Sequence, residues 1–545
     1  MTCIGVIEAD LKESPIGTRS RLGDDLRGEP VLTRTIRQMG HVRCVDRVFV
    51  LCGDDEMDRC RSMVPQDARE RVTVRGTRIK QTPFRHLVRT ARKWSLDGWR
   101  GGLGGVCCMD EYTRTDELAL LAHEQKADTV LCAPAAAPLF DPKLADAMIE
   151  HAERTREESR LTFVQSPPGL AGTVFRTELL IEMGQKHVPP GFVTSYKPDT
   201  PQMDLALKSC CYPASRAVRH SSGRMIADTD RAWASIAEYV AGGGPIDAER
   251  IGQWLMDRDA SAVPALPREV EIELTTDDQL PNALLRPRGD RVRRRGPIEL
   301  GIVERIATEM AAFDDALIVL GGFGEPLLHP RFDEVLRNIR SAGVYGVAVR
   351  TNGIALDAER IESLIRHQVD VLNVVLDGWT AATYAAVQGA DRLDAVLANI
   401  KRLTTMRNEA QSVAPLLVPE LTKSNETADE MEPFFDGWVR ETGWACISGY
   451  SHYAGQMPDR AVMDMTPPTR FACRRIRHRA TVLADGTMPV CDQDFNGLHP
   501  AGDLHRMSLA DCWHGPTMTR ARERHRDGDF NATPLCARCA EWHRP

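Results

Sequence analysis

The 545-residue sequence has no long apolar run. No stretch approaches the roughly 18 consecutive apolar residues that suggest a membrane-spanning helix. The opening MTCIGVIEADLKESP also has no basic segment before its first apolar residues, and its first acid is Glu8. This opening predicts a β-strand and not a signal peptide. We therefore expect a cytoplasmic protein that has no membrane contact.

A strong charge of either sign is missing too. The formal net charge is −8 and 27% of the residues are charged, which is an ordinary balance for a globular chain. Nucleic acid is therefore not an expected partner, since that function usually needs a clearly basic surface. At roughly 100–200 residues per domain, the length predicts three or four domains.

Cysteine, in contrast, is abundant, with 15 residues. In a reducing compartment, closely spaced cysteines indicate metal or redox chemistry more often than structural disulfides.

Strand-like apolar runs alternate with helical patterns, and this alternation predicts an α/β fold. The runs TCIGVI, RVFVLC and TVLCAP indicate a first domain at residues 1–245. Residues 246–267 adjoin a Gly-rich break and end in a Pro-rich stretch, so we predict a linker there. A second series, with ALIVLGG and YGVAVRTNG, occupies residues 268–465. Residues 466–545 have only short apolar runs, so we expect this tail to need a metal in order to fold.

Four cysteines of the tail have spacings typical of metal ligands. Cys536 and Cys539 form a CxxC pair, which brings two thiolates to one metal from a tight turn. Cys491 ends a Gly-x4-Cys element that looks like a β-hairpin, and Cys473 precedes the first strand of that hairpin. Soft thiolates bind iron–sulfur clusters or zinc, and free reduced thiols are a third interpretation. Cys512 is expected to be a small buried residue on a helix, with a role as a substitute ligand as the alternative.

The segment from Arg470 to His543 resembles the SPASM/twitch extension of radical SAM enzymes. The shared features are a Cys, then Gly-x4-Cys, then the stretch AGDLHRMSLADCW, then a closing CxxC. The intervals between the cysteines are 18, 45 and 3 residues, similar to those of twitch domains with a single auxiliary cluster. The resemblance implies one [4Fe–4S] cluster held by Cys473, Cys491, Cys536 and Cys539.

Residues 268–465 resemble the partial (β/α)6 barrel of radical SAM enzymes. GGFGEP, at residues 321–326, resembles the loop that holds the amino group of S-adenosylmethionine in that family. The strand-end TNG at residues 351–353 and the segment VVLDGWTAATYAAVQG resemble further parts of the cofactor site. Alone, a Gly-rich strand end is more often a tight turn. The resemblance implies cofactor contacts from Gly321, Gly322, Gly324, Glu325, Asn352 and Asp377.

The barrel departs from its family at the cluster motif. Members place CxxxCxxC after the first strand, and the three cysteine positions correspond here to Asp278, Asn282 and Leu285. No cysteine lies between Cys211 and Cys446, so a shifted motif is absent as well. Leucine cannot bind iron, and hard oxygen donors suit iron–sulfur clusters poorly. We therefore expect no standard radical chemistry, and only weak, metal-free contact with S-adenosylmethionine.

Six arginines follow directly, within the ten residues 286–295. This run is either a solvated loop or an anion or phosphate site, because guanidinium groups pair well with phosphate.

The first domain resembles nucleotidyltransferases of the sugar-acid cytidylyltransferase type. The similarity lies in GVIEADLKESPIGTRSRLGDDLRGEPVLTRTI, in TVLCAPAAAPLFDPKLADAMI and in RMIADTDRAWASI. The family's phosphate-binding lysine has no counterpart, and Ala136 replaces its Mg²⁺-binding aspartate, while Asp228 is kept. One carboxylate does not replace a pair at a metal–triphosphate site. We therefore expect a nucleotidyltransferase-like (GT-A/Rossmann-like) fold without the activity.

These three domains in this order resemble spiro-SPASM proteins. Two functions from different classes follow. The first is a non-catalytic or electron-transfer protein that carries the cluster and binds an unidentified protein or a nucleotide-type ligand. The second is an enzyme, either a nucleotidyl- or sugar-modifying transferase or a radical SAM-type enzyme with unorthodox cluster ligation.

Overall fold

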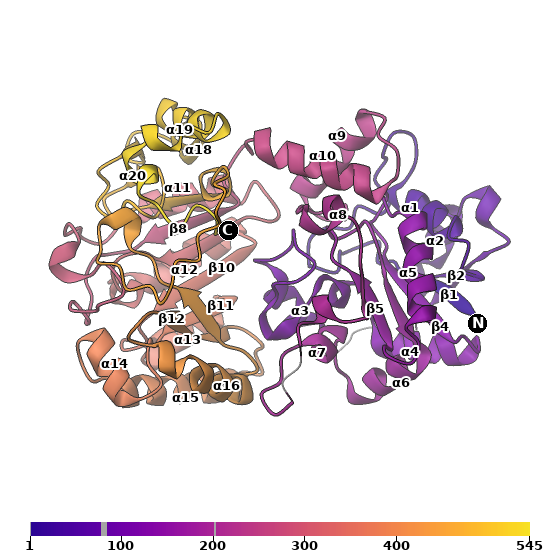
Figure 1. The fold of residues 1–545 in the computed structure, drawn as a ribbon, viewed down its shortest axis with the longest axis horizontal. Helices are drawn as coiled ribbons and strands as arrows, with labels where there is room; N and C mark the ends of the chain where they lie inside the picture. The colour runs from indigo at the N-terminus through magenta and orange to yellow at the C-terminus, as the bar shows by residue number, and fades with distance from the viewer. Residues whose placement is uncertain (1, 78–83, 201–202, 545) are drawn as a thin grey trace. The chain divides into compact units, whose positions relative to one another are not determined.

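The computed structural model describes residues 2–77, 84–200 and 203–544. The chain divides into two compact units, Met1–Asp259 and Ala260–Pro545. Both units are α/β, as predicted (Figure 1). The residues predicted to be a linker contain a helix, α10 (Ala248–Ser261).

The first unit is built on one seven-stranded sheet with the order β3-β2-β1-β4-β6-β5-β7. Strand β6 runs antiparallel to both of its neighbours, and the other pairings are parallel. Strand β4 is buried along its whole length, because helices cover both faces of such a sheet. The strands are β1 (Cys3–Glu8), β2 (Arg47–Cys52), β3 (Val72–Gly76), β4 (Thr129–Pro134), β5 (Leu161–Val164), β6 (Thr173–Arg176) and β7 (Cys211–Tyr212).

Ten α-helices accompany this sheet within the described residues; α10 extends two residues into the second unit. Asp141 begins α5 as a cap, since its carboxylate accepts from the backbone N–H groups of Lys143 and Leu144. The other helices are α1 (Val31–Gly40), α2 (Met57–Ser62), α3 (Arg85–Arg92), α4 (Thr115–Glu124), α5 (Pro142–Arg154), α6 (Thr177–Lys186), α7 (Pro190–Thr194), α8 (Arg216–His220) and α9 (Asp230–Ala241).

The second unit has an open, curled sheet of seven parallel strands, in the order β13-β12-β11-β10-β9-β8-β14. This half-barrel arrangement fits the predicted radical SAM fold. The last strand, β14, comes from the cysteine-rich tail and pairs with β8, more than 200 residues earlier. The strands are β8 (Glu269–Glu273), β9 (Leu317–Gly321), β10 (Gly346–Thr351), β11 (Val371–Val375), β12 (Leu416–Lys423), β13 (Cys446–Gly449) and β14 (Arg479–Val482).

The tail also forms a separate two-stranded antiparallel sheet from β15 (Thr487–Pro489) and β16 (Pro500–Asp503). Its buried residues, such as Trp513 and Met488, share one apolar core with the barrel helices. Figure 1 shows α18, α19 and α20 together beside α11. The helices are α11 (Leu300–Met310), α12 (Phe332–Ala342), α13 (Ala358–Arg366), α14 (Ala381–Gln388), α15 (Leu393–Glu409), α16 (Met431–Thr442), α17 (Arg475–His478), α18 (Leu509–Trp513), α19 (Pro516–Arg526) and α20 (Pro534–Ala537).

Across the described residues, no helix has both the length and the apolar character needed to cross a membrane.

Candidate functional site

The four predicted ligand cysteines lie around one small cavity in the tail. Cys473 comes just before α17, and Cys491 follows β15. Cys536 lies in α20, and Cys539 follows that helix by two residues. The fold thus brings together residues from three separate segments of the tail. Within the described residues, no three His, Cys, Asp or Glu side chains have the arrangement that holds a single metal ion.

Burial makes these thiols weak acids. It raises the pKa of Cys536 to about 12 and that of Cys539 to about 11. The pKa of Cys491 is raised well above its ordinary value for the same reason. In the metal-free chain the thiols are therefore protonated at neutral pH, and a bound metal would have to displace those protons. Four soft sulfur donors, two buried and two partly buried, suit an iron–sulfur cluster.

One histidine contacts two of these cysteines. The backbone N–H of Cys473 donates to Nδ1 of His525 at 3.1 Å, and Nε2 of His525 lies 3.3 Å from Sγ of Cys536. Burial lowers the pKa of His525 to about 4, so the ring is neutral at pH 7. Because Nδ1 accepts, the single ring proton is on Nε2 and points at the sulfur. The backbone N–H of Glu541 donates to Sγ of Cys539 at 3.2 Å. Such N–H···S contacts tune the potential of iron–sulfur clusters.

Cys512 lies away from this cavity. It is fully buried on α18, against β16. A Cβ atom on Gly502 would come within 2.2 Å of its sulfur, so β16 and α18 approach closely there. Its surroundings are those of a packed core residue.

The predicted cofactor loop of the barrel is assembled at the carboxyl ends of β9 and β10. Glu325 accepts hydrogen bonds from the backbone N–H of Asn352 and from the hydroxyl of Thr351, both at 2.8 Å. The side chain is buried, and this burial raises the pKa of Glu325 to about 7. A Cβ atom at position 324 would lie 2.1 Å from the carbonyl oxygen of Thr275, which explains the glycine there.

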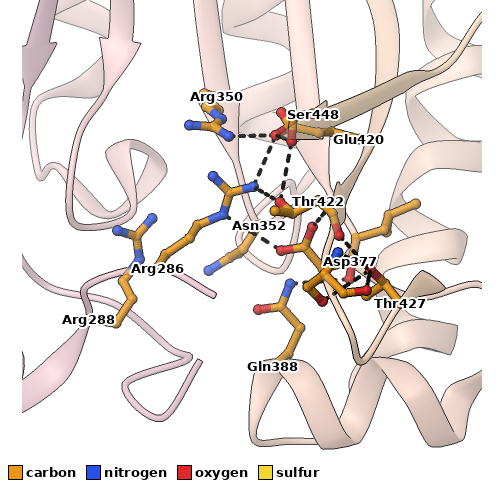
Figure 2. Close-up of polar contacts among 12 residues, drawn as sticks. Arg286, Arg288, Arg350, Asn352, Asp377, Gln388, Glu420, Thr422, Thr427 and Ser448 are labelled. Carbon is orange, nitrogen blue, oxygen red and sulfur yellow. Dashed lines mark hydrogen bonds and ion pairs between the residues drawn. The ribbon is translucent and has the colours of Figure 1, made fainter. Parts of the chain in front are cut away.

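Gly321 ends β9, and Gly322, Gly324 and Glu325 follow it, whereas Asp377 comes after β11. Its carboxylate accepts from the backbone N–H of Thr422 at 2.7 Å (Figure 2). The predicted site residues Glu325 and Asn352 therefore touch, whereas Asp377 is directed toward β12.

The residues at the positions of the missing cysteines make other contacts. Asp278 forms an ion pair with Nε of Arg288 at 2.5 Å and accepts from the backbone N–H of Leu280 at 2.8 Å. Leu285 is buried against Val387 and Tyr450. An iron–sulfur cluster does not fit this donor set, since a carboxylate already held by a guanidinium and an apolar side chain cannot replace thiolates.

In the first unit, the retained aspartate, Asp228, is also held in an ion pair. Both carboxylate oxygens of Asp228 accept from Arg224, at 2.6 and 2.5 Å. Arg224 donates at the same time to Glu111, which is paired with Arg92 at 2.7 Å. All four side chains are buried. Ala136 lines the same cavity as Asp228, which also has the carboxylates of Glu8, Asp10, Glu13 and Glu111 in its wall.

Comparison with known families identifies two of these parts. Residues 285–430 match the radical SAM superfamily, and residues 473–540 match the SPASM iron–sulfur cluster-binding domain. The chain carries a radical SAM domain followed by a SPASM domain. The radical SAM match begins at Leu285, so it leaves out Asp278 and Asn282.

Curated relatives match parts of the chain. An uncharacterized protein of Treponema pallidum is 27% identical over 36% of this chain and 57% of its own length. A tungsten-containing aldehyde ferredoxin oxidoreductase cofactor-modifying protein of Pyrococcus furiosus is 25% identical over 25% of this chain and 38% of its own. A probable GTP 3′,8-cyclase of Metallosphaera sedula is 34% identical over 19% of this chain and 32% of its own length. The chain thus spans only 32–57% of the length of these relatives.

Among solved structures, BtrN in complex with AdoMet and 2-DOIA is 16% identical, with a TM-score of 0.36 over 50% of this chain and 93% of BtrN. Streptococcus suis SuiB bound to precursor peptide SuiA is 12% identical, with a TM-score of 0.40 over 53% of this chain and 80% of SuiB.

Several residues of these sites escaped the sequence analysis. His525 is one, because nothing in its local sequence separates it from the other histidines of the tail. Arg350 and Glu420 are others; the ion pair between them, at 2.6 Å, joins β10 to β12. Only the position of Arg350 directly before the TNG segment was a visible signal.

Proposed function

We propose that this protein is an iron–sulfur protein whose SPASM domain holds one [4Fe–4S] cluster and whose radical SAM domain generates no radical. One contrast carries the proposal. Four thiols, two of them buried and two partly buried, line a single cavity in the tail, while the barrel has an Asp278–Arg288 ion pair at the usual cluster position. Cys473, Cys491, Cys536 and Cys539 would hold the cluster.

When bound, such a cluster supplies one-electron redox chemistry. The chain's own contribution is to bury the sulfur atoms and to direct N–H groups at them, from His525 and from the backbone of Glu541. Both features adjust a cluster's potential without opening an iron to substrate. We therefore propose a role in electron transfer or in binding a protein or nucleotide-type partner, in the cytoplasm.

For the first unit we propose a degenerate nucleotidyltransferase-like domain, which makes the whole chain a spiro-SPASM protein. The support is a doubly wound sheet in which the connections diverge between β1 and β4, the position where such sheets form a ligand crevice. The ion pairs of Asp228 with Arg224 support the loss of metal-dependent transfer, because a carboxylate with both oxygens engaged is a poor metal ligand.

A second candidate is an enzyme with unorthodox cluster ligation. The names of two relatives favour it, one a cofactor-modifying protein and the other a probable GTP 3′,8-cyclase. The intact contact between Glu325 and Asn352 favours it too.

The two candidates differ in one reaction. We expect the anaerobically purified protein, incubated with dithionite and S-adenosylmethionine, to form no 5′-deoxyadenosine above background by mass spectrometry. The reason is that a tetrad of thiolates leaves no open iron, and Asp278 and Leu285 cannot hold a second cluster. Stoichiometric 5′-deoxyadenosine that disappears in Glu325→Ala would establish the enzyme instead.

A further inference from the structure

The arginine run after β8 does not form a uniform loop. Arg293 and Arg294 are exposed, whereas Arg295 is buried in an ion pair with Glu273 at 2.7 Å. Arg286 and Arg288 are largely buried, with 11% and 14% of their side chains exposed. They are separated by the buried Pro287. Both of these arginines line one cavity at the strand ends of the barrel.

A third arginine reaches the same cavity from the sheet. Arg350, the residue before the TNG segment, comes from β10 and is 34% exposed. Figure 2 shows its guanidinium near those of Arg286 and Arg288, with the amide groups of Asn352 and Gln388 nearby. The cavity is small, about 20 Å³, so a ligand would enter it with one head group.

The charges of the cavity wall favour an anion. Its charged lining residues are three arginines and two acids, the latter being Asp278 and Glu325. Asp278 is neutralised by Arg288. Burial raises the pKa of Glu325 to about 7, which removes part of its negative charge at neutral pH. The lining therefore has one more positive than negative group when both acids are ionised, while Glu420, outside the lining, is shared by Arg286 and Arg350 and Asp377 lies beside Arg286.

The guanidinium groups also keep donors unused. Arg286 gives one nitrogen, Nη2, to Glu420 and Thr422 at 3.0 Å. Its Nε is buried and makes no hydrogen bond among the described residues, although Asp377 lies 3.7 Å away. Arg350 uses Nε and Nη2, for Asn373 and Glu420. Charge-assisted donors that are held in place but not saturated are the requirement for an oxyanion site.

We propose that this cavity is a binding site for a phosphate-class oxyanion, either free phosphate or the phosphate group of a small monoester. Arg286 and Arg288 approach from the loop and Arg350 approaches from the sheet, so donors come from more than one direction. A tetrahedral phosphate can accept from all of them, whereas a planar carboxylate matches a single guanidinium fork. In place of the cluster and its bound cofactor, the radical SAM domain would then recognise a phosphate group.

The test uses the full-length protein and isothermal titration calorimetry with inorganic phosphate, glycerol phosphate and acetate. Two variants weaken the site: Arg288→Lys keeps a cation beside Asp278 but loses the fork, and Arg350→Gln removes the most exposed of the three arginines. Arg294→Gln is the matched control, since it removes the same charge from an exposed position of the same loop.

We expect one phosphate per chain, affinity reduced by at least about tenfold in both site variants, and no more than about a twofold change in Arg294→Gln. Tighter binding of glycerol phosphate than of phosphate would identify a monoester as the ligand, and the reverse would identify free phosphate. The proposal is overturned if the unmodified protein binds neither, if all three variants bind equally, or if acetate binds as tightly as phosphate. Iron content plays no part in this test, so its outcome is independent of the proposed cluster.

Discussion

At the scale of single residues, the cysteines of the tail have different roles. Cys536→Ala and Cys539→Ala should each abolish the visible iron–sulfur absorption of the anaerobically purified protein, because each removes a thiol from the common cavity. Cys512→Ala is the control and should keep the absorption, since its sulfur packs against Gly502 and not in that cavity. Absorption lost in Cys512→Ala and kept in Cys539→Ala would contradict the assignment of the ligands.

Glu325 should make the stability of the protein depend on pH. Burial raises its pKa to about 7 in the folded state, so the folded chain keeps a proton that the unfolded chain releases near pH 4.5. The contribution is therefore largest below the unfolded pKa and is lost as the pH rises through the folded pKa. Between about pH 5.5 and about pH 8 it should lower the free energy of unfolding by on the order of 2 kcal/mol.

Glu325→Gln should reduce this decline, as measured by chemical unfolding at the two pH values. Part of the decline in the free energy of unfolding should remain in both the variant and the unmodified protein, because burial also raises the pKa of Asp110 to about 7. Glu359→Gln is the matched control, since that carboxylate is 85% exposed. If Glu325→Gln and Glu359→Gln show the same pH dependence as the unmodified protein, the proton on Glu325 is not the cause.

What the sequence could reveal about residues depended on distance along the chain. Cys536 and Cys539 are three positions apart, so their shared purpose is visible without a structure. The partners of Arg286 and Arg350 are not, because Glu420 is 134 and 70 residues away from them. The run of six arginines at residues 286–295 left a solvated loop and an anion site both open, because the local sequence does not show which of these side chains face a cavity.

At the scale of elements, the tail is not uniform. Strand β14 pairs with β8 of the barrel sheet, whereas the short helices α17 and α20 lie next to the cysteines. This long-range pairing has no signature in the local sequence, since a strand of four residues looks the same in a hairpin or at a sheet edge.

Removal of the metal should affect these elements differently. In the metal-free protein we expect faster amide exchange in α20 and around Cys491, because the cavity would hold four thiols without a common ligand. Strand β14 should stay protected by its hydrogen bonds to β8 and by the barrel core. Hydrogen–deuterium exchange with mass spectrometry, compared between metal-loaded and metal-free protein, measures both. Equal loss of protection in α20 and β14 would mean that the whole tail folds as one unit with its metal.

At the scale of the molecule, two α/β units and a cluster-binding tail could be expected from the sequence, because strand runs, glycine-rich strand ends and cysteine spacing are local patterns. The ion pairs that occupy the two altered sites were harder to foresee. The sequence shows that Asp228 is kept, but only the fold shows that Arg224 engages both of its oxygens. Likewise, the sequence shows that the barrel cysteines are missing, and the fold shows that Arg288 pairs with Asp278 in their place.

The central claim is that the molecule has a single cluster and that it lies in the tail. Iron and acid-labile sulfide should be measured in anaerobically purified protein, with EPR of the dithionite-reduced sample. Because the tail supplies one complete set of four thiols, we expect about four irons and four sulfides per chain and one [4Fe–4S] signal, absent in Cys536→Ala. Zinc in place of iron, or about eight irons with a second signal that survives in Cys536→Ala, would contradict the account.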